Sequence, residues 1–226
     1  MDDKYLVSVA MTTYNGEAFL REQLDSIISQ SYTNWELIVC DDCSSDGTWQ
    51  ILQDYVCRDI RIRVYRNEKN LGFKKNFEKA ISLCKGKYIA LSDQDDVWNE
   101  SHIQVLLSEI QGKSAASGNA TIIDENGNVA PYLLSDGDRY FCSGNDVEKL
   151  YTVLSFRNPF SGAISIYSKD FFDIALPIPE CVKYHDLWFS AIACCLNGLN
   201  YTFEPLLKHR IHGKNESGEH HVTFWD

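Results

Sequence analysis

The stretch KYIALSDQDDVW, residues 87–98, is the most informative part of the chain. It begins as a β-rich apolar run and ends in three aspartates within four positions, Asp93, Asp95 and Asp96. Carboxylates this close repel one another, and burying them is costly unless a cation is near. Because few lysines or arginines lie nearby in sequence, the cluster predicts either a divalent cation on carboxylate oxygens or a solvated acidic turn that caps the next helix.

Strand-like and helix-like segments alternate on both sides of this stretch. Predicted strands cover residues 5–11, 35–42, 62–67 and 87–93, and predicted helices cover residues 17–30, 44–58, 73–84 and 100–112. The strands are largely apolar, and the helices repeat apolar residues at a spacing of three and four. This alternation predicts an α/β fold, a single Rossmann-like domain whose mostly parallel central sheet is flanked by helices.

The second half of the chain is less regular. The pattern predicts a strand and a turn over residues 120–134, a helix over 144–156, a turn, strand and helix over 159–172, an apolar helix over 185–198, and a strand with a basic loop over 200–215. No linker, repeat or low-complexity segment interrupts it. We therefore expect residues 1–226 to form one domain.

Polar residues follow the first, second and fourth predicted strands. Thr12 and Tyr14 come after the first strand, Asp41 and Asp42 after the second, and residues 93–96 after the fourth. In open parallel sheets, ligands bind beyond the carboxyl ends of the strands. We therefore expect these residues to face one crevice.

Composition limits the partners. With 44% apolar and 12% aromatic residues the chain can build a substantial core, and its formal net charge of −11 argues against a nucleic-acid partner and weakly against docking on an anionic membrane. No apolar run is long enough to span a bilayer, and the N-terminus resembles a strand rather than a signal peptide. The eight cysteines are irregularly spaced, which favours free thiols in a reducing cytoplasm over zinc or disulfide sites.

Several motifs in order carry a family resemblance. They are TTYNG (residues 12–16), DDCSSDGT (41–48), NLGFKKNF (70–77), ALSDQDD (90–96), HDLW (185–188) and KHRIHGKN (208–215). In sequence and spacing the chain resembles the nucleotide-sugar-dependent glycosyltransferases of family 2, which have the GT-A fold. The late motifs are most similar to the bacterial rhamnosyltransferase-like branch. The resemblance implies a nucleotide-sugar-binding half over residues 1–100 and an acceptor-binding half with a basic C-terminal loop over 101–226.

The resemblance implies a donor site in the first half. Thr12, Tyr14 and Glu17 match positions that line the nucleotide pocket, where an aromatic ring can stack on the base. Asp41 matches the aspartate that accepts a hydrogen bond from the pyrimidine N3–H, whereas Asp42 and Asp46 are expected to cap the helix near Gly47.

Further donor and metal positions follow from the same motifs. Asn76 is expected to point towards the sugar nucleotide, although its segment can equally be a solvated helix face. Asp93 matches the position near the ribose, and Asp95 the ligand of Mg²⁺ or Mn²⁺ on the diphosphate. In the basic loop, Arg210 is expected to hold phosphate and His212 to ligate the metal, with an ordinary basic surface loop as the alternative.

Asp186 matches the general base of the inverting members, which removes the proton from the acceptor hydroxyl. An N-cap aspartate at the start of a helix is the alternative. Trp98 and Trp188 are expected either to flank the acceptor sugar or to lie in the core.

The implied reaction moves a sugar, with rhamnose a candidate, from a UDP- or dTDP-linked donor to a hydroxyl of a bacterial cell-surface glycan or lipid-linked saccharide, with inversion. The expected location is cytoplasmic, extending to the inner face of the plasma membrane, with at most peripheral membrane contact. The alternatives are a sugar nucleotidyltransferase, which usually carries a Gly-rich basic loop after the first strand, and an inactive sugar-nucleotide-binding protein. The sequence TTYNGEAF lacks such a loop.

Overall fold

The computed structural model describes residues 4–135, 142–155, 158–213 and 215. Its strands are β1 (Val7–Thr13), β2 (Trp35–Asp41), β3 (Ile62–Arg66), β4 (Tyr88–Ser92), β5 (Val97–Trp98), β6 (Ala115–Ile123), β7 (Val129–Leu133), β8 (Ser165–Ser168) and β9 (Leu199–Arg210). Its α-helices are α1 (Leu20–Ile28), α2 (Thr48–Val56), α3 (Phe73–Leu83), α4 (His102–Ile110), α6 (Asp146–Leu154), α7 (Phe172–Ala175) and α8 (His185–Cys195). Short 3₁₀ turns, η1 (Gly162–Ile164) and η2 (Lys169–Phe171), flank β8.

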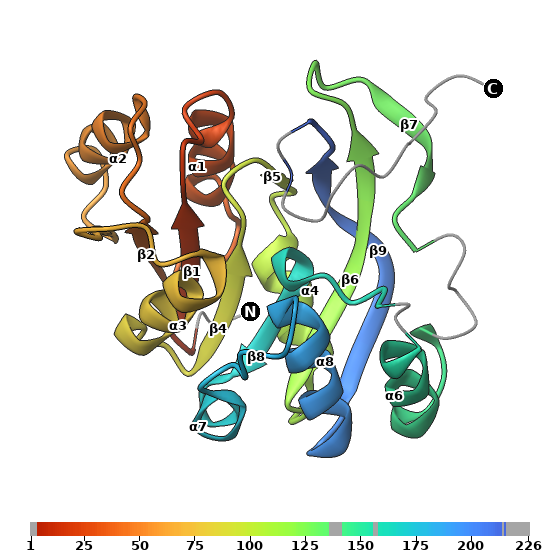
Figure 1. Cartoon of the computed structure of the whole chain (residues 1–226). Coiled ribbons are helices and arrows are strands. Elements are labelled where there is room, and N and C mark those ends of the chain that lie inside the picture. The colour runs from red at the N-terminus through yellow and green to blue at the C-terminus, as the bar shows by residue number, and fades with distance from the viewer. Residues whose placement is uncertain (1–3, 136–141, 156–157, 214, 216–226) are drawn as a thin grey trace.

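The strands join in one sheet of order β3-β2-β1-β4-β8-β6-β9-β5, with β7 paired to β6 (Figure 1). β3, β2, β1 and β4 are mutually parallel, and β8 turns the direction between β4 and β6. Because β9 is parallel to β6, the strands β1, β2, β3, β4, β6 and β9 all run the same way. The predicted α/β fold with a mostly parallel sheet is confirmed.

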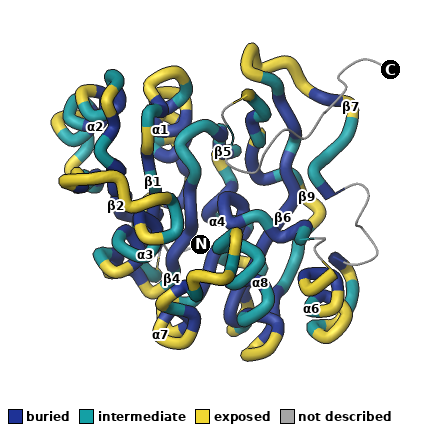
Figure 2. Tube along the Cα trace, in the orientation of Figure 1, coloured by how far each residue is buried: buried dark blue, intermediate teal, exposed yellow. Residues whose placement is uncertain are grey.

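Helices cover both faces of the sheet. Residues at alternate positions of β1 point to opposite sides: Val7, Val9 and Met11 pack with helices α1, α2 and α4, while Ala10 packs with α3 and α8. This alternation follows from the two-residue period of a strand, and it explains why the strands are apolar on both faces. In Figure 2 the buried strands form the dark interior, and the exposed residues gather on the outer sides of the helices.

The sequence pattern missed three features. β6 begins at Ala115, five residues before the expected start, and the two-residue strand β5 was not expected. The C-terminal basic segment is not all loop, because Lys208, His209 and Arg210 are the last residues of β9. The pairing of Val97 with Lys208 explains this, since β5 and β6 hold β9 as a strand up to its end.

None of the helices in the described part of the chain has the length and apolar character that crossing a bilayer requires.

Candidate active site

The order of the strands reverses between β1 and β4. β2 and β3 extend the sheet on one side of β1, whereas β4 lies on the other side. Such a switch point leaves a crevice at the carboxyl ends of the strands. The loops after β1 and β4 lie there, and the ends of β6 and β9 lie at the same edge because these strands share the direction of β1 (Figure 1).

Histidines at the end of β9 face the acidic loop after β4. His212 Nε2 lies 2.8 Å from Asp95 Oδ2, and His209 Nδ1 lies 2.9 Å from Asp96 Oδ1. Burial alone would lower the pKa of His209, but the carboxylate of Asp96, with the charges of Asp95 and Asp93, raises that pKa to about 9. Protonated His209 therefore compensates part of the repulsion in the cluster.

Asp93 is the acid of this loop with the least compensation. Burial, followed by the charges of Asp96 and Asp95, raises the pKa of Asp93 well above its ordinary value, and His209 only partly opposes this. The charge of Asp186 acts in the same direction, so α8 brings this carboxylate within electrostatic reach of the acidic loop. A Cβ added to Gly162 would lie within 4 Å of both His185 and Leu91 of β4, so the start of α8 lies close to the strand that leads into the acidic loop.

Packing of its neighbour His185 holds Asp186 in place. The His185 ring lies 4.5 Å from the ring of Phe77, and a Cβ added to Gly162 would lie 2.8 Å from His185 Nε2. The start of α8 is therefore fixed against α3 and the η1 turn. Asp186 itself is half-buried, and its Oδ1 accepts a hydrogen bond of 2.7 Å from the amide of Leu187. The N-cap position belongs to Tyr184, so Asp186 is not the N-cap aspartate of the alternative interpretation.

The loop after β1 presents an exposed aromatic ring. Tyr14 is 48% exposed, and Thr12 lies half-buried near the end of β1. Glu17 is exposed, but its Oε2 accepts a hydrogen bond of 2.5 Å from the amide of Gly47 at the start of α2. Tyr14 is thus the predicted pocket residue of this loop whose side chain is most open to a ligand.

Asp41 is fully buried at the end of β2. Its Oδ1 accepts hydrogen bonds from Thr13 Oγ1 at 3.0 Å and from Ser44 Oγ at 2.5 Å, and its Oδ2 accepts one from the Ser44 amide at 3.1 Å. Arg66 Nε lies 3.5 Å from the same Oδ2. Most of the accepting capacity of this carboxylate is therefore used within the protein, where Oδ1 accepts two hydrogen bonds and Oδ2 accepts one and faces Arg66.

Asp42 corrects the expectation that it caps α2. It is buried, and it accepts hydrogen bonds from Asn67 Nδ2 at 2.7 Å and from the amides of Leu71 and Gly72 at 2.8 and 2.9 Å. It thereby holds the turn at Gly72, whose φ of +80° favours glycine. Asp46 does bond the start of α2, since its Oδ1 accepts from the Thr48 amide at 3.0 Å.

Two predicted donor-binding residues point into the protein instead. Asn76 is 1% exposed, and its amide bonds the carbonyl oxygen of Cys40 and the side chain of Asn67. The Arg210 side chain is 3% exposed and ion-paired to Glu22 at 2.6 Å. The expectation that both side chains face the donor is corrected, because their polar groups already have partners inside the fold.

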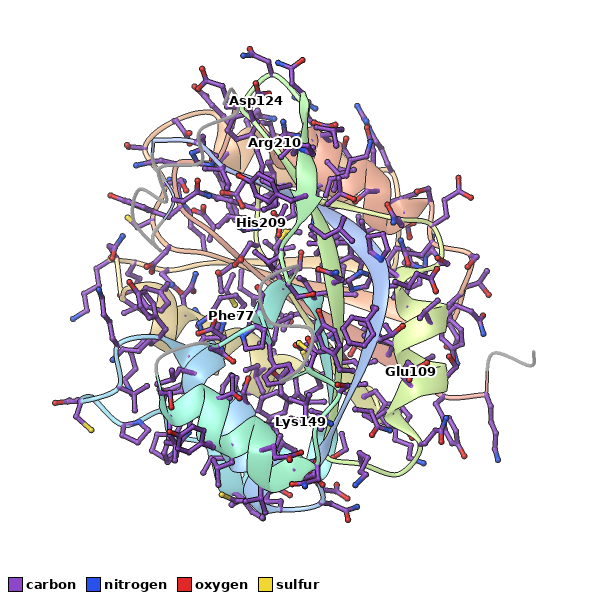
Figure 3. All side chains as sticks on the ribbon, turned by 90° about the vertical axis from the view of Figure 1, so that its right-hand side faces the viewer. Phe77, Glu109, Asp124, Lys149, His209 and Arg210 are labelled. Atoms are coloured by element: carbon purple, nitrogen blue, oxygen red, sulfur yellow. The ribbon has the colours of Figure 1, made fainter. Side chains whose placement is uncertain are left out.

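Arg210 joins four segments at the site. Its Nε donates to the Asp95 carbonyl oxygen at 3.0 Å, its Nη1 lies 3.4 Å from the carbonyl oxygen of Asp124 in the β6–β7 turn, and its guanidinium stacks 4.7 Å from the Phe19 ring. Figure 3 shows Arg210 and Asp124 at one end of the molecule, with His209 below them. Arg210 thus holds the backbone of the acidic loop from the protein interior. Lys214, in the same basic segment, lies outside the described residues.

The pair Asp95 and His212 can be tested as a metal site. Asp95 Oδ2 and His212 Nε2 are hydrogen-bonded at 2.8 Å, and a carboxylate with a neutral imidazole is a donor pair that suits Mn²⁺ and tolerates Mg²⁺. No group of three or more His, Cys, Asp or Glu side chains gathers for a metal within the described residues. A cation held here would therefore need water or ligand oxygens as well.

The tryptophans differ in role. Trp98 is 3% exposed and stacks on His102 with ring centroids 3.9 Å apart, so it belongs to the core. Trp188 is half-buried and donates its Nε1–H to the carbonyl oxygen of Ala175 at 2.7 Å. Among the described residues, no ring contact places Trp98 or Trp188 against the acidic loop.

Sequence reasoning missed Gln94, Glu22 and His209. Gln94 bonds the backbone of Tyr14, Glu22 pairs with Arg210, and His209 pairs with Asp96. The spacings of these pairs, from 80 to 188 residues, hide them from any local pattern. The position of Gln94 between two aspartates of the acidic loop was the available signal.

Comparison with known proteins shows a family to which most of the chain is similar. The family described as Glycosyl transferase family 2 matches residues 8–174. The teichuronic acid biosynthesis glycosyltransferase TuaG of Bacillus subtilis, a putative assignment, is 38% identical over 113 residues, 50% of this chain and 45% of that protein. The glucosyltransferase WfgD of Escherichia coli is 37% identical over 136 residues, 59% of this chain and 52% of that protein. The chain spans about half the length of these curated relatives.

Solved structures share the fold. Staphylococcus aureus TarS, in complex with UDP-GlcNAc, superposes with a TM-score of 0.75 at 22% identity, over 95% of this chain and 61% of that one. The mannosyltransferase PcManGT of Pyrobaculum calidifontis, in complex with GDP-Man and Mn²⁺, gives a TM-score of 0.66 at 17% identity, over 90% of this chain and 56% of that one.

Proposed function

The chain belongs to glycosyl transferase family 2 and has the GT-A fold, and from this premise we propose that it is an inverting glycosyltransferase. It transfers a sugar from a nucleoside-diphosphate donor to a hydroxyl of a saccharide. One observation carries the proposal: His185, next to Asp186 at the start of α8, packs on Phe77 and on Gly162 close to Leu91 of β4, so Asp186 lies near the acidic loop that follows β4. An acceptor base and a donor loop therefore flank one space.

The donor lies across the carboxyl ends of β1, β2 and β4. Tyr14, with its exposed ring, stacks on the base, while Asp41 Oδ2 accepts from the N3–H of uracil or thymine. Asp93 lies near the ribose, as the family motif implies. Thr12 lines the pocket, and Glu17 shapes it through the Gly47 amide. UDP- and dTDP-linked donors both satisfy this hydrogen-bond pattern.

The diphosphate lies at Asp95 and His212. Their side chains, Oδ2 of Asp95 and Nε2 of His212, would hold Mg²⁺ or Mn²⁺. Such a cation would stabilise the negative charge that develops on the departing diphosphate. Arg210 donates to the Asp95 carbonyl oxygen and so keeps the Asp95 backbone in position. The contact between Asp96 and His209 joins the same loop to the end of β9.

Asp186 is the general base. Its half-buried carboxylate has one oxygen bonded to the Leu187 amide, and the acceptor hydroxyl donates its proton to the carboxylate. The deprotonated oxygen attacks the anomeric carbon from the face opposite the leaving diphosphate, which inverts the configuration. No covalent intermediate forms, so the protein needs no nucleophile of its own.

The acceptor is a bacterial cell-surface glycan or a lipid-linked saccharide, and rhamnose is a candidate for the sugar transferred. The names of the relatives TuaG and WfgD, which refer to teichuronic acid and to a diphosphoundecaprenol-linked acceptor, support this class. Residues 1–100 bind the donor, and residues 101–226 with Asp186 bind the acceptor. The protein acts in the cytoplasm or at the inner face of the plasma membrane.

The test measures release of nucleoside diphosphate from a panel of UDP- and dTDP-sugars with Mn²⁺, with and without saccharide acceptors. The proposal expects metal-dependent release from one donor class. Asp95→Ala should reduce it by about 10²–10³-fold, and Asp186→Asn should reduce turnover by about 10²–10⁴-fold while donor affinity stays unchanged. Tight donor binding with no turnover on any acceptor would instead indicate a binding protein. Pyrophosphate from a nucleoside triphosphate and a sugar phosphate would indicate a nucleotidyltransferase.

A further inference from the structure

We propose that Gln94 is a positioning residue that locks the base-stacking tyrosine to the metal-binding loop, so that the protein recognises a nucleoside diphosphate as one unit. The inference rests on the proposed function, because it assigns the base to Tyr14 and the diphosphate to Asp95. Gln94 touches neither ligand itself and acts through the backbone of Tyr14.

The contact is bidentate. The Tyr14 amide donates to Gln94 Oε1 at 2.9 Å, and Gln94 Nε2 donates to the Tyr14 carbonyl oxygen at 3.1 Å. A carboxamide carries one acceptor and one donor group side by side, so it pairs with a peptide group as a neighbouring strand would. An aspartate or glutamate at position 94 would lack the donor, which explains why an amide stands among the acids.

A glycine makes room for this pairing. A Cβ added to Gly16 would lie 2.2 Å from Gln94 Oε1 and 2.4 Å from Gln94 Cδ, so any other residue would displace the carboxamide. Gly16 is not one of the described glycines with a positive φ, so its backbone conformation does not require glycine. The need for glycine at position 16 is therefore steric and comes from Gln94.

Three successive amides of this loop each have a side-chain acceptor from a different segment. The Tyr14 amide bonds Gln94, the Asn15 amide bonds Ser44 Oγ at 3.0 Å, and the Gly16 amide bonds Thr48 Oγ1 at 2.8 Å. The second and third acceptors belong to the loop after β2 and the start of α2. Gln94 alone among these three comes from the acidic loop after β4.

This arrangement fixes a distance within the site. Gln94 is directly followed by Asp95, so the residue that holds the Tyr14 backbone and the proposed ligand of the diphosphate cation share one rigid turn. Gln94 therefore fixes the Tyr14 backbone relative to Asp95, and in the proposed complex it fixes the base relative to the diphosphate. Without Gln94, both parts would still bind their own groups, but the loop after β1 would have to be ordered when the nucleotide binds.

The experiment uses Gln94→Ala, Gly16→Ala, the double variant, and Gln50→Ala as a matched control on the exposed face of α2. Binding of UDP, dTDP and inorganic pyrophosphate is measured with Mn²⁺ by calorimetry. Gln94→Ala should weaken binding of the nucleoside diphosphate about tenfold and leave pyrophosphate binding unchanged, because the loop that carries Tyr14 must then be ordered when the nucleotide binds, while the cation site remains. Gly16→Ala should change the binding of nucleotide and pyrophosphate in the same way as Gln94→Ala. The control Gln50→Ala should bind both as the wild type does.

The double variant and amide hydrogen exchange test the contact between Gln94 and the Tyr14 backbone separately from the proposed function. Gly16→Ala should lower Tm, and adding Gln94→Ala should restore it, since the added methyl then has space. Hydrogen exchange at the Tyr14 amide should quicken about tenfold in Gln94→Ala. Unchanged exchange, or equal weakening of pyrophosphate and nucleotide, would overturn the inference while the wild type still binds its donor. A wild type that binds neither nucleotide would overturn the proposed function and this inference together.

Discussion

Two acidic clusters follow strands on either side of β1, and they differ in how their charge is compensated. After β2, the carboxylates of Asp41, Asp42 and Asp46 accept hydrogen bonds from amides and hydroxyls of neighbouring loops. After β4, Asp95 and Asp96 instead face histidines from the far end of the chain. Asp93 has a pKa that burial and its acidic neighbours raise.

The difference separates structural acids from reactive ones. A carboxylate that accepts several backbone hydrogen bonds stabilises a loop and has little capacity left for a ligand. A carboxylate held near like charges is destabilising for the fold, and such groups persist where function needs them. In the proposed complex the loop after β2 therefore shapes the site and contributes Asp41 Oδ2 to the base, whereas the loop after β4 holds the diphosphate.

The largest expected effect compares one acid from each loop. Asp95→Ala should reduce turnover by about 10²–10³-fold with little change in Tm, because the charge lies at the proposed diphosphate site. Asp46→Ala should lower the free energy of unfolding by about 1 kcal/mol through the lost bond to the Thr48 amide, with turnover largely retained. Donor-hydrolysis rates and thermal melts of both variants measure the contrast. Similar turnover losses in the two variants would contradict it.

The second effect is on stability. Asp42→Asn should lower the free energy of unfolding by about 2–3 kcal/mol, since the new amide group meets the donors of Asn67, Leu71 and Gly72. Asp93→Asn should leave stability unchanged or raise it at pH 7, because the ionised form of Asp93 is disfavoured in the folded protein. Urea unfolding of the two isosteric variants provides the comparison. A loss in Asp93→Asn as large as that in Asp42→Asn would show that the two loops do not differ.

The third effect is a pH dependence that the loop after β4 should have. The pKa of His209 is about 9 in the folded protein and about 6.5 in an unfolded chain. Its contribution is therefore fully present below pH 6.5 and is lost as the pH rises through 9. The expected loss is on the order of 3 kcal/mol. Unfolding free energies of the wild type and of His209→Gln between pH 6 and 10 measure it, and equal slopes for the two proteins would refute the assignment.

The smallest effect concerns the ion pair behind the loop. Glu22 is 57% exposed whereas Arg210 is 3% exposed. Glu22→Gln should therefore cost no more than about 1 kcal/mol of unfolding free energy, since an exposed carboxylate gains little from pairing. Arg210→Met should cost several times more, because it also removes the bonds to the Asp95 and Asp124 carbonyl oxygens. Denaturant melts of the two variants give the ratio, and equal losses would be inconsistent with the buried position of Arg210.

The features that depend on the apolar period and on the order of strands and helices could be predicted from the sequence. Apolar strands alternating with amphipathic helices predicted the parallel sheet, and the carboxyl-end rule predicted that Tyr14, Asp41 and Asp95 gather at one edge.

Long-range pairing lay beyond the pattern. The sequence around Asn76 is compatible with a solvated helix face and with a ligand-binding one. In the structure Asn76 is buried because its amide donates to the carbonyl oxygen of Cys40 on β2. Arg210 looks like a phosphate ligand because it stands in a basic segment, yet the pairing of β9 with β6 turns its side chain inwards. Its partner Glu22 is 188 residues away. Such contacts arise from strand register, which no local period reveals.

The most direct test is a crystal structure of Asp186→Asn with Mn²⁺ and an intact nucleotide sugar, since this variant should bind the donor without consuming it. The account predicts the cation on Asp95 and His212, the base on Tyr14, and the anomeric carbon facing residue 186. A diphosphate bound away from Asp95, or a sugar directed away from α8, would contradict the claim that one donor lies between these two regions.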